Sequence, residues 1–255
     1  MTETLTFSPD SWLSPEMMPA TLKFVLLASA LSLEPALVMM TTCFVRIAVV
    51  LGLLRQALGF QQLLPNQVMT GLALFVTLTV MWPVWQQSYE QGVRPYTEST
   101  YSSPEEKSAA LRVAINRTVQ PVRRFMSSQI EAAGNEAAID LFLDYQNPGR
   151  SDTAPAAYYE DVPLSVLIPA YVLSELKTAF LIGFQVYLPF LVIDVVIGAL
   201  LSGMGLLTIS PAMVAVPCKL LLFVTADGWF LVVQLLLDSL PPLRGCPPAG
   251  SRAGA

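Results

Sequence analysis

Long apolar stretches, interrupted by prolines and by single charged residues, dominate this chain. The most informative stretch is 163–240, which is apolar enough for a membrane. Charged residues nevertheless occur well inside it: Glu175, Lys177, Asp194, Lys219 and Asp227. Any of these charges would be expensive to leave unpaired in hydrocarbon. We therefore expect each of them to have a partner within protein.

The spacing of charges and prolines in this stretch predicts broken helices. Between Lys177 and Asp194 lie 16 uncharged residues, and between Asp194 and Lys219 lie 24. A spanning helix needs about 20 continuous apolar residues, so the first run is short. Prolines also kink or end helices. We expect short helices packed against protein, interrupted at Pro169, Pro189, Gly203, Gly205, Pro211 and Pro217.

An earlier apolar region, 22–89, predicts a first hydrophobic helical hairpin. Its first element carries Arg46 and Arg55, which are nine residues apart and lie on roughly opposed faces of a helix. We expect Arg46 to pair inside a bundle and Arg55 to reach an interface near Gly59.

The second element of this hairpin has the clearest membrane signal, because no charged residue occurs from Gln56 through Tyr89. Pro65 is expected to open its helix and Pro83 to close it. Three aromatic residues fit the belt found at membrane interfaces: Trp82, Trp85 and Tyr89.

Residues 90–162 differ in kind, with 11 acidic and 7 basic residues between turn-rich borders. The run SPEE at 103–106 supplies an N-cap, a proline at the first helical position and acids in the first turn. This helix is expected to end or kink at Pro121, and a second helix to run over 129–145. We interpret the region as a small soluble helical insertion.

The two ends carry no apolar element. Residues 1–21 are polar and lack the basic region that opens a signal peptide. The tail, 241–255, is rich in Pro, Gly and Ala, and we expect it to be disordered. The predicted fold is therefore an all-α membrane protein, with helical hairpins of kinked or broken apolar helices in 22–89 and 163–240 around the soluble insertion.

Composition narrows the function classes. The 255 residues are 54% hydrophobic and 13% charged, with a mean hydropathy of +0.56, which indicates an integral membrane protein. The net charge of -5 and the scattered basic residues argue against nucleic acid as a partner. There is no histidine, and the three cysteines stand singly, so no metal site, cofactor or disulfide framework is expected.

The positive-inside rule gives a topology. The turn between the first two apolar elements has Arg55 at its edge and no acidic residue, which places it on the cytoplasmic side. The insertion at 90–162 is then expected to face the non-cytoplasmic side.

Five segments together resemble one protein family: MMTTCFVRIAVVLGLLRQALG, PNQVMTGLALFVTLTVMWPVW, VPLSVLIPAYVLSELKTAF, YLPFLVIDVVIGALLSGMG and VPCKLLLFVTADGW. They are similar to the FliP family, the P subunits of the bacterial flagellar export gate. They resemble slightly less the paralogous R subunit of the virulence injectisome core. The resemblance runs from about Leu22 to Leu240, and the form SELKTAF favours the flagellar branch.

The resemblance implies a subunit of the flagellar type III protein export gate in the bacterial inner membrane, within the flagellar basal body. Several copies of the chain would assemble with the Q and R subunits of the gate. Other membrane proteins of the export apparatus and membrane lipid would be further contacts. The assembly would form the conduit for unfolded flagellar substrates.

The resemblance also implies roles for single residues. Glu175 and Lys219 fall on the acid and the base that pair between neighbouring P subunits; the alternative is an ion pair internal to one subunit. Asp194 and Asp227 match family acids and are expected, with Arg46, to be buried charges. Whether the two aspartates relay protons or only cap and pair stays open.

The segment GALLSGMGLL falls on the methionine-rich loop that closes the family's pore as a gasket. Here only the first methionine is present, and leucines follow it. Leucine keeps an apolar seal but adapts less well than methionine. The expected gasket residues are Gly203, Met204, Gly205, Leu206 and Leu207; the alternative is a tight turn between two core helices.

Two other classes compete with this interpretation. An intramembrane aspartyl protease would need two facing aspartates, but neither Asp194 nor Asp227 lies in a GxGD frame. A small-molecule secondary transporter shares the broken helices and the intramembrane charges. Such carriers usually have two repeated halves, which this sequence does not show. We therefore expect a protein without enzymatic activity.

Overall fold

A computed structural model describes residues 20–59, 65–99, 101, 103–146, 162–206, 208 and 210–240. Every regular element in this part of the chain is a helix, which confirms the predicted class. The tail at 241–255 and residues 1–19 lie outside it. The chain divides into two units, Met1–Met39 and Met40–Ala255. The first holds most of helix α1 (Ala20–Thr41), and all other helices belong to the second.

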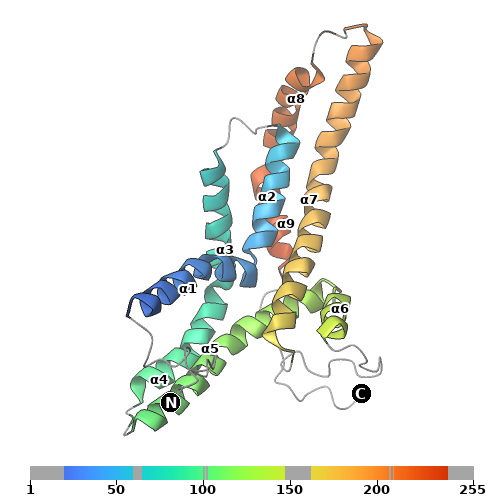
Figure 1. The fold of residues 1–255 in the computed structure, drawn as a ribbon. Coiled ribbons are helices and arrows are strands. Elements are labelled where there is room, and N and C mark those ends of the chain that lie inside the picture. Colours follow the sequence, from blue (N-terminus) through green and yellow to red (C-terminus); the bar gives the residue numbers. More distant parts are fainter. Residues whose placement is uncertain are drawn as a thin grey trace, which may run out of the picture. The chain divides into compact units, whose positions relative to one another are not determined.

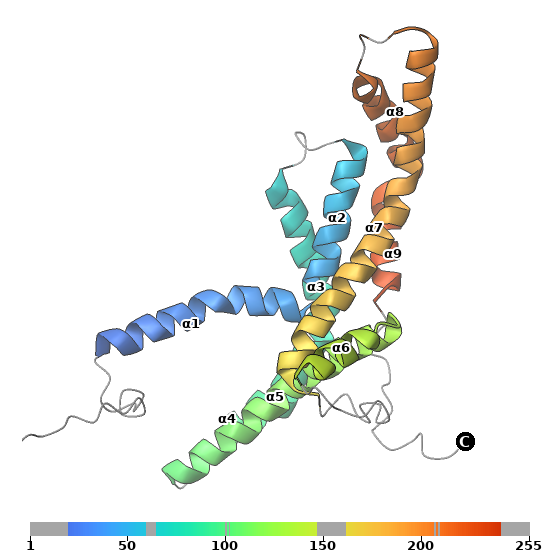
Figure 2. The same ribbon diagram turned by 45° about the vertical axis from the view of Figure 1, so that its right-hand side comes forward.

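The second unit is organised around one long helix, α7 (Leu164–Gly203). Three other helices run beside it, α2 (Phe44–Leu58), α8 (Pro211–Thr225) and α9 (Gly228–Asp238), and a fourth, α3 (Asn66–Ser88), contacts α2 instead. α2 packs mainly against α7, while α8 and α9 return along α7 in both views (Figures 1 and 2). α3 packs on α2. Apolar residues of α2 and α7 form the centre of the core: Ile47, Val50, Leu51, Leu54, Val166, Leu167, Ala170 and Tyr171.

Prolines do not end the helices. α7 is one helix of 40 residues that passes through Pro169 and Pro189, so the expectation of short helices is wrong there. Pro83 lies inside α3, and Pro121 lies inside α5 (Pro104–Ala132). A proline removes one backbone hydrogen bond. Tertiary packing along the rest of each helix outweighs that loss, because most helical stability in proteins comes from a buried face.

The helix that starts with α3 is longer than predicted. It continues without a loop through a π-helical turn, η2 (Tyr89–Val93), into α4 (Arg94–Glu98), and so runs past residue 90. Gly92 lies where η2 meets α5. A Cβ at this position would overlap Thr118 and lie 2.6 Å from its backbone nitrogen, so the close approach requires glycine.

The insertion contains two helices, α5 and α6 (Ala137–Gln146). As predicted, Ser103 caps α5: its side chain accepts a hydrogen bond from the backbone N–H of Glu106 at 3.1 Å. α5 ends before Gly134, whose left-handed backbone (φ 61°) turns the chain. The second helix therefore begins later than the predicted 129–145.

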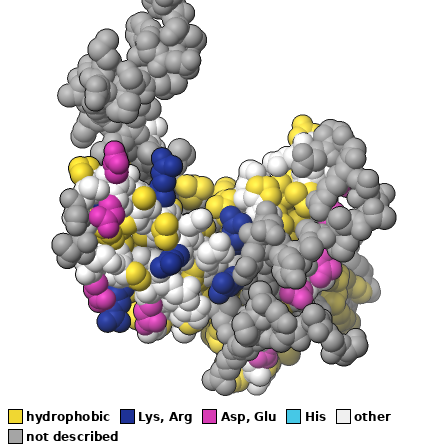
Figure 3. Space-filling view, turned by 90° about the horizontal axis from the view of Figure 1, so that it is seen from below, with side chains coloured by type: hydrophobic (Ala, Val, Ile, Leu, Met, Phe, Trp, Pro, Cys, Tyr) yellow, Lys and Arg dark blue, Asp and Glu magenta, His cyan; other side chains and the backbone are white. Residues whose placement is uncertain are grey.

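Two of the described helices are long and apolar enough to cross a membrane: Asn66–Glu98 and Leu164–Gly203. Two bent pairs bring the number to four if each pair counts as one span. Figure 3 shows the face that lies at the bottom of Figure 1. Acidic and basic side chains are interspersed there, which is typical of a solvated surface.

Candidate functional site

A buried ion pair joins α2 to α7 inside the core. Nε of Arg46 donates to Oε2 of Glu175 at 2.8 Å, and Nη2 donates to Oε1 at 2.5 Å. The two side chains are 1% and 0% exposed. Paired bonds between a guanidinium and a carboxylate are strong and fix the geometry of both groups.

The other donors of Arg46 reach two more elements. Nη1 donates to the backbone carbonyl of Ser239, just after α9, at 2.6 Å, and Nη2 donates to Oε1 of Gln129 in α5 at 3.3 Å. One guanidinium thus connects four segments of the bundle. Sequence reasoning missed Gln129 and Ser239. Gln129 could have been found, because it continues the apolar stripe of α5 four residues after the buried Phe125.

A second ion pair joins α8 to α7. Nζ of Lys219 lies 2.6 Å from Oδ2 of Asp194 and also donates to the backbone carbonyl of Ala57 at 2.8 Å. Ala57 is in the last turn of α2, where carbonyls lack a partner within the helix and the helix dipole favours a cation. The Lys219 side chain is 7% exposed, whereas that of Asp194 is 36% exposed.

Within one chain Glu175 and Lys219 are not brought together, because each has a different partner. The pair expected between neighbouring subunits concerns contacts that a single chain does not contain, so it stays a prediction. Such a pair requires Glu175 or Lys219 to share or exchange its internal partner.

The expected gasket residues lie where α7 ends. Gly205 has a left-handed backbone (φ 74°), and its N–H and that of Leu206 bind the carbonyls of Ser202 and Leu201. This is a Schellman turn, in which glycine is the favoured left-handed residue.

The side chains at this turn are apolar and exposed. Met204 is 62% exposed and Leu206 is 40% exposed, while Leu207 lies outside the described residues. Gly203 is helical, and a Cβ there would meet open space, so glycine is not required at that position. An exposed apolar tip fits both a gasket and a simple turn, and the gasket role stays a prediction.

A smaller polar contact ties the turn after α5 to α7. Nδ2 of Asn135 donates to Oγ of Ser174 at 2.8 Å, and Nζ of Lys177 donates to Oδ1 of Asn135 at 2.6 Å. Ser174 and Lys177 are three residues apart and therefore lie on one side of the helix. Sequence reasoning did not single out Asn135.

α8 and α9 meet at a bend of 66°. Asp227 forms the bend with a left-handed backbone (φ 51°) and is exposed, although it was expected to be buried. Gly228 follows it, and a Cβ there would overlap the ring of Phe223, 2.8 Å from its Cγ. We call this bend, from Thr225 to Gly228, the elbow.

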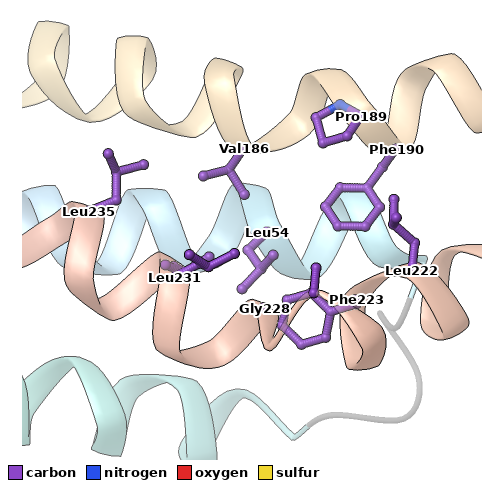
Figure 4. A pocket seen from close by; sticks show the side chains of 11 residues that line it. Leu54, Val186, Pro189, Phe190, Leu222, Phe223, Gly228, Leu231 and Leu235 are labelled. Atoms are coloured by element: carbon purple, nitrogen blue, oxygen red, sulfur yellow. The ribbon is translucent and has the colours of Figure 1, made fainter.

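An apolar cavity of about 270 Å³ lies beside the elbow, between α2, α7, α8 and α9 (Figure 4). Its lining residues are all apolar: Leu54, Val186, Pro189, Phe190, Leu222, Phe223, Ala226, Gly228, Leu231, Val232 and Leu235. Such a lining offers no side-chain polar group to orient a ligand. Among the described residues no group of three or more Cys, Asp or Glu is arranged to hold a metal ion.

Comparison with known proteins gives one consistent result. The sequence model of the FliP family matches residues 27–236. The flagellar biosynthetic protein FliP of Caulobacter vibrioides is 43% identical over 84% of this chain and 74% of its own length. The proteins of that name from Pectobacterium carotovorum and Bacillus subtilis are 41% and 36% identical, over 85% and 88% of this chain and 76% and 94% of their own lengths.

Proposed function

The chain belongs to the FliP family of flagellar biosynthetic proteins, and on this premise we propose that it is a subunit of the flagellar type III protein export gate. The observation that carries the proposal is the family match over residues 27–236. The relatives reported above carry flagellar names, which favours this branch over the virulence injectisome.

In this proposal several copies assemble with the Q and R subunits of the gate, in contact with other membrane proteins of the export apparatus. Exposed apolar side chains on α3, α7, α8 and α9 support a role inside a larger assembly or a membrane, because patches of this kind mark interaction surfaces. They include Phe75, Trp82, Phe180, Phe184, Val195, Leu221, Val224 and Phe230.

The proposed location is the inner membrane at the flagellar basal body, with the insertion on the non-cytoplasmic side. The two to four candidate spans support a membrane location. Arg55 near the end of α2 supports the orientation only through the positive-inside rule.

The proposed mechanism is a protein conduit for unfolded flagellar polypeptides. The Arg46–Glu175 and Lys219–Asp194 pairs make α2, α7 and α8 one stiff support. The apolar tip at Met204 and Leu206 seals the pore at rest and gives way to a passing chain. The subunit makes or breaks no covalent bond in this scheme, and it is not an enzyme.

The test combines native mass with motility. Expressed with its chromosomal neighbours and extracted in mild detergent, the chain should run as a discrete complex of several copies with two hydrophobic partners. Deletion of its gene should abolish swimming and the secretion of rod and hook proteins. Two results together would sink the proposal: the extracted chain runs as a monomer or a simple dimer without partners, and the deletion strain still swims.

A further inference from the structure

Asp227 stands apart from the other charges in the apolar part of the chain. Glu175 and Asp194 have internal cationic partners. Asp227 is exposed, and in the part of the chain that the structure describes no basic group pairs with it. Its side chain also makes no capping hydrogen bond to the start of α9.

Asp227 lies near the middle of the apolar surface of the second unit. Exposed apolar residues of α7 and of the turn after it run from Leu173 to Met204. Phe190, close to the middle of this run, packs against Phe223 with ring centroids 6.3 Å apart. Asp227 follows Phe223 by four residues, just past the end of α8, so it lies near the middle of this apolar surface.

Exposed apolar side chains lie before and after Asp227 along both helices: Leu221, Val224, Trp229, Phe230 and Leu231. A lone charge on such a surface is unfavourable once the surface is covered by lipid or protein. Whatever covers the elbow must therefore supply a counter-charge or water at the level of Asp227.

The backbone at Asp227 has a defined shape before any partner arrives. A non-glycine residue with φ of 51° is uncommon, and Asp and Asn tolerate it best. The close contact between Gly228 and the ring of Phe223 fixes the next residue. The elbow therefore holds the backbone of Asp227 in a defined position.

We propose that the elbow is a docking surface for an apolar helix of another protein subunit, and that this helix carries a lysine or arginine which pairs with Asp227. A protein helix can bring an apolar face and one cationic side chain to the elbow together, which matches an apolar surface that holds a single unpaired acid. The inference rests on the proposed role of the chain inside an assembly.

The test uses the full-length chain in its native cells, with the photo-crosslinking residue p-benzoylphenylalanine in place of Phe230. Phe230 is 64% exposed and lies three residues from Asp227. We expect a crosslink to an apolar protein segment that contains lysine or arginine, identified by mass spectrometry. Asp227→Asn removes the charge but keeps the left-handed preference. It should reduce the crosslink at least about tenfold, the equivalent of 1.4 kcal/mol.

Two further variants complete the design. Asp227→Lys should abolish the crosslink, and an acidic residue in place of the partner's lysine or arginine should restore it. Asp238→Asn is the matched control, because Asp238 is an exposed acid at the other end of α9. The control should leave the crosslink unchanged, and equal melting temperatures should show that all variants fold.

Three results would overturn the inference: crosslinks to lipid alone, protein crosslinks that ignore the charge at Asp227, or an elbow lined by water. The last would appear as rapid reaction of Asp227→Cys with a membrane-impermeant thiol reagent in a cysteine-free background. If the complex and motility persist in any of these cases, only the docking inference fails. If no complex forms with the unaltered chain, the proposed function fails with it.

Discussion

Replacing Arg46 by methionine would strand a fully buried carboxylate. Among the described residues, both oxygens of Glu175 accept hydrogen bonds from Arg46 alone. Removing one partner of a buried ion pair typically costs about 3–5 kcal/mol, because the remaining charge keeps its desolvation penalty. The carbonyl of Ser239 and the amide of Gln129 also lose a bond, each worth about 1 kcal/mol. The lower end of the range for the pair, together with these two bonds, gives a total of about 5 kcal/mol.

The double variant Arg46→Met/Glu175→Leu separates the stranded charge from the lost bonds. Well-packed apolar side chains often replace a buried pair at little cost. The double variant should therefore be about 3 kcal/mol more stable than Arg46→Met alone. With Glu175→Leu as the second single variant, a double-mutant cycle then measures the coupling between the two residues. The control is Arg117→Met, because Arg117 is exposed on α5 and its loss should stay within about 0.5 kcal/mol.

The assay is thermal unfolding of the detergent-extracted chain. For a protein of this size 1 kcal/mol corresponds to roughly 2–4 °C, so Arg46→Met should melt roughly 10–20 °C lower than the unaltered chain. A shift no larger than that of Arg117→Met would refute the reasoning. So would a double variant whose loss equals the sum of the two single losses, because independent sites add.

Three further predictions concern local geometry and use the same melting assay. Gly205→Ala places a side chain on a left-handed backbone and should cost about 1 kcal/mol of stability. Gly203→Ala should be neutral or stabilising, because a Cβ there meets open space in a helix. Equal shifts in melting temperature for the two variants would contradict this. Gly92→Ala should lower the melting temperature by several degrees through its clash with α5, and an unchanged value would mean that this contact yields easily. Asp194→Ala should lower the melting temperature more than Lys219→Met. The first change leaves the buried ammonium of Lys219 without its carboxylate, whereas the second leaves the carboxylate of Asp194, which water reaches. The reverse order would count against this argument.

Local signals were sufficient for part of the fold. The helical class follows from long apolar runs without strand periodicity, and the start of α5 follows from Ser103 and the acids after it. The pairing of Arg46 inside the bundle was expected because a guanidinium in an apolar helix needs an acceptor. These features depend on composition or on residues a few positions apart.

The remaining features depend on how helices pack. Because proline tends to end a helix, the sequence predicted helix ends at Pro83 and Pro169. Both helices nevertheless continue through these residues, because they pack against buried neighbours. The partner of Arg46 lies 129 residues away in the chain, so helix register rather than sequence spacing selects Glu175. The left-handed backbone of Asp227 was also beyond local rules, since glycine is the usual residue in such a position.

The ion pairs within one chain, Arg46–Glu175 and Lys219–Asp194, decide how the expected contact between Glu175 and Lys219 of neighbouring subunits should be tested. Exchanging the residues at 175 and 219 would set a lysine against Arg46 and a glutamate against Asp194, two like-charge contacts within one chain. If the internal pairs persist in the assembly, this exchange destabilises each subunit and restores nothing. If assembly replaces them by a pair between Glu175 and Lys219 of neighbouring subunits, the exchanged chain should recover its oligomer. Recovery of the native mass by the doubly exchanged chain would therefore demonstrate partner exchange. If the exchanged chain forms no complex and also melts at a lower temperature, Glu175 instead belongs to the core of a single subunit.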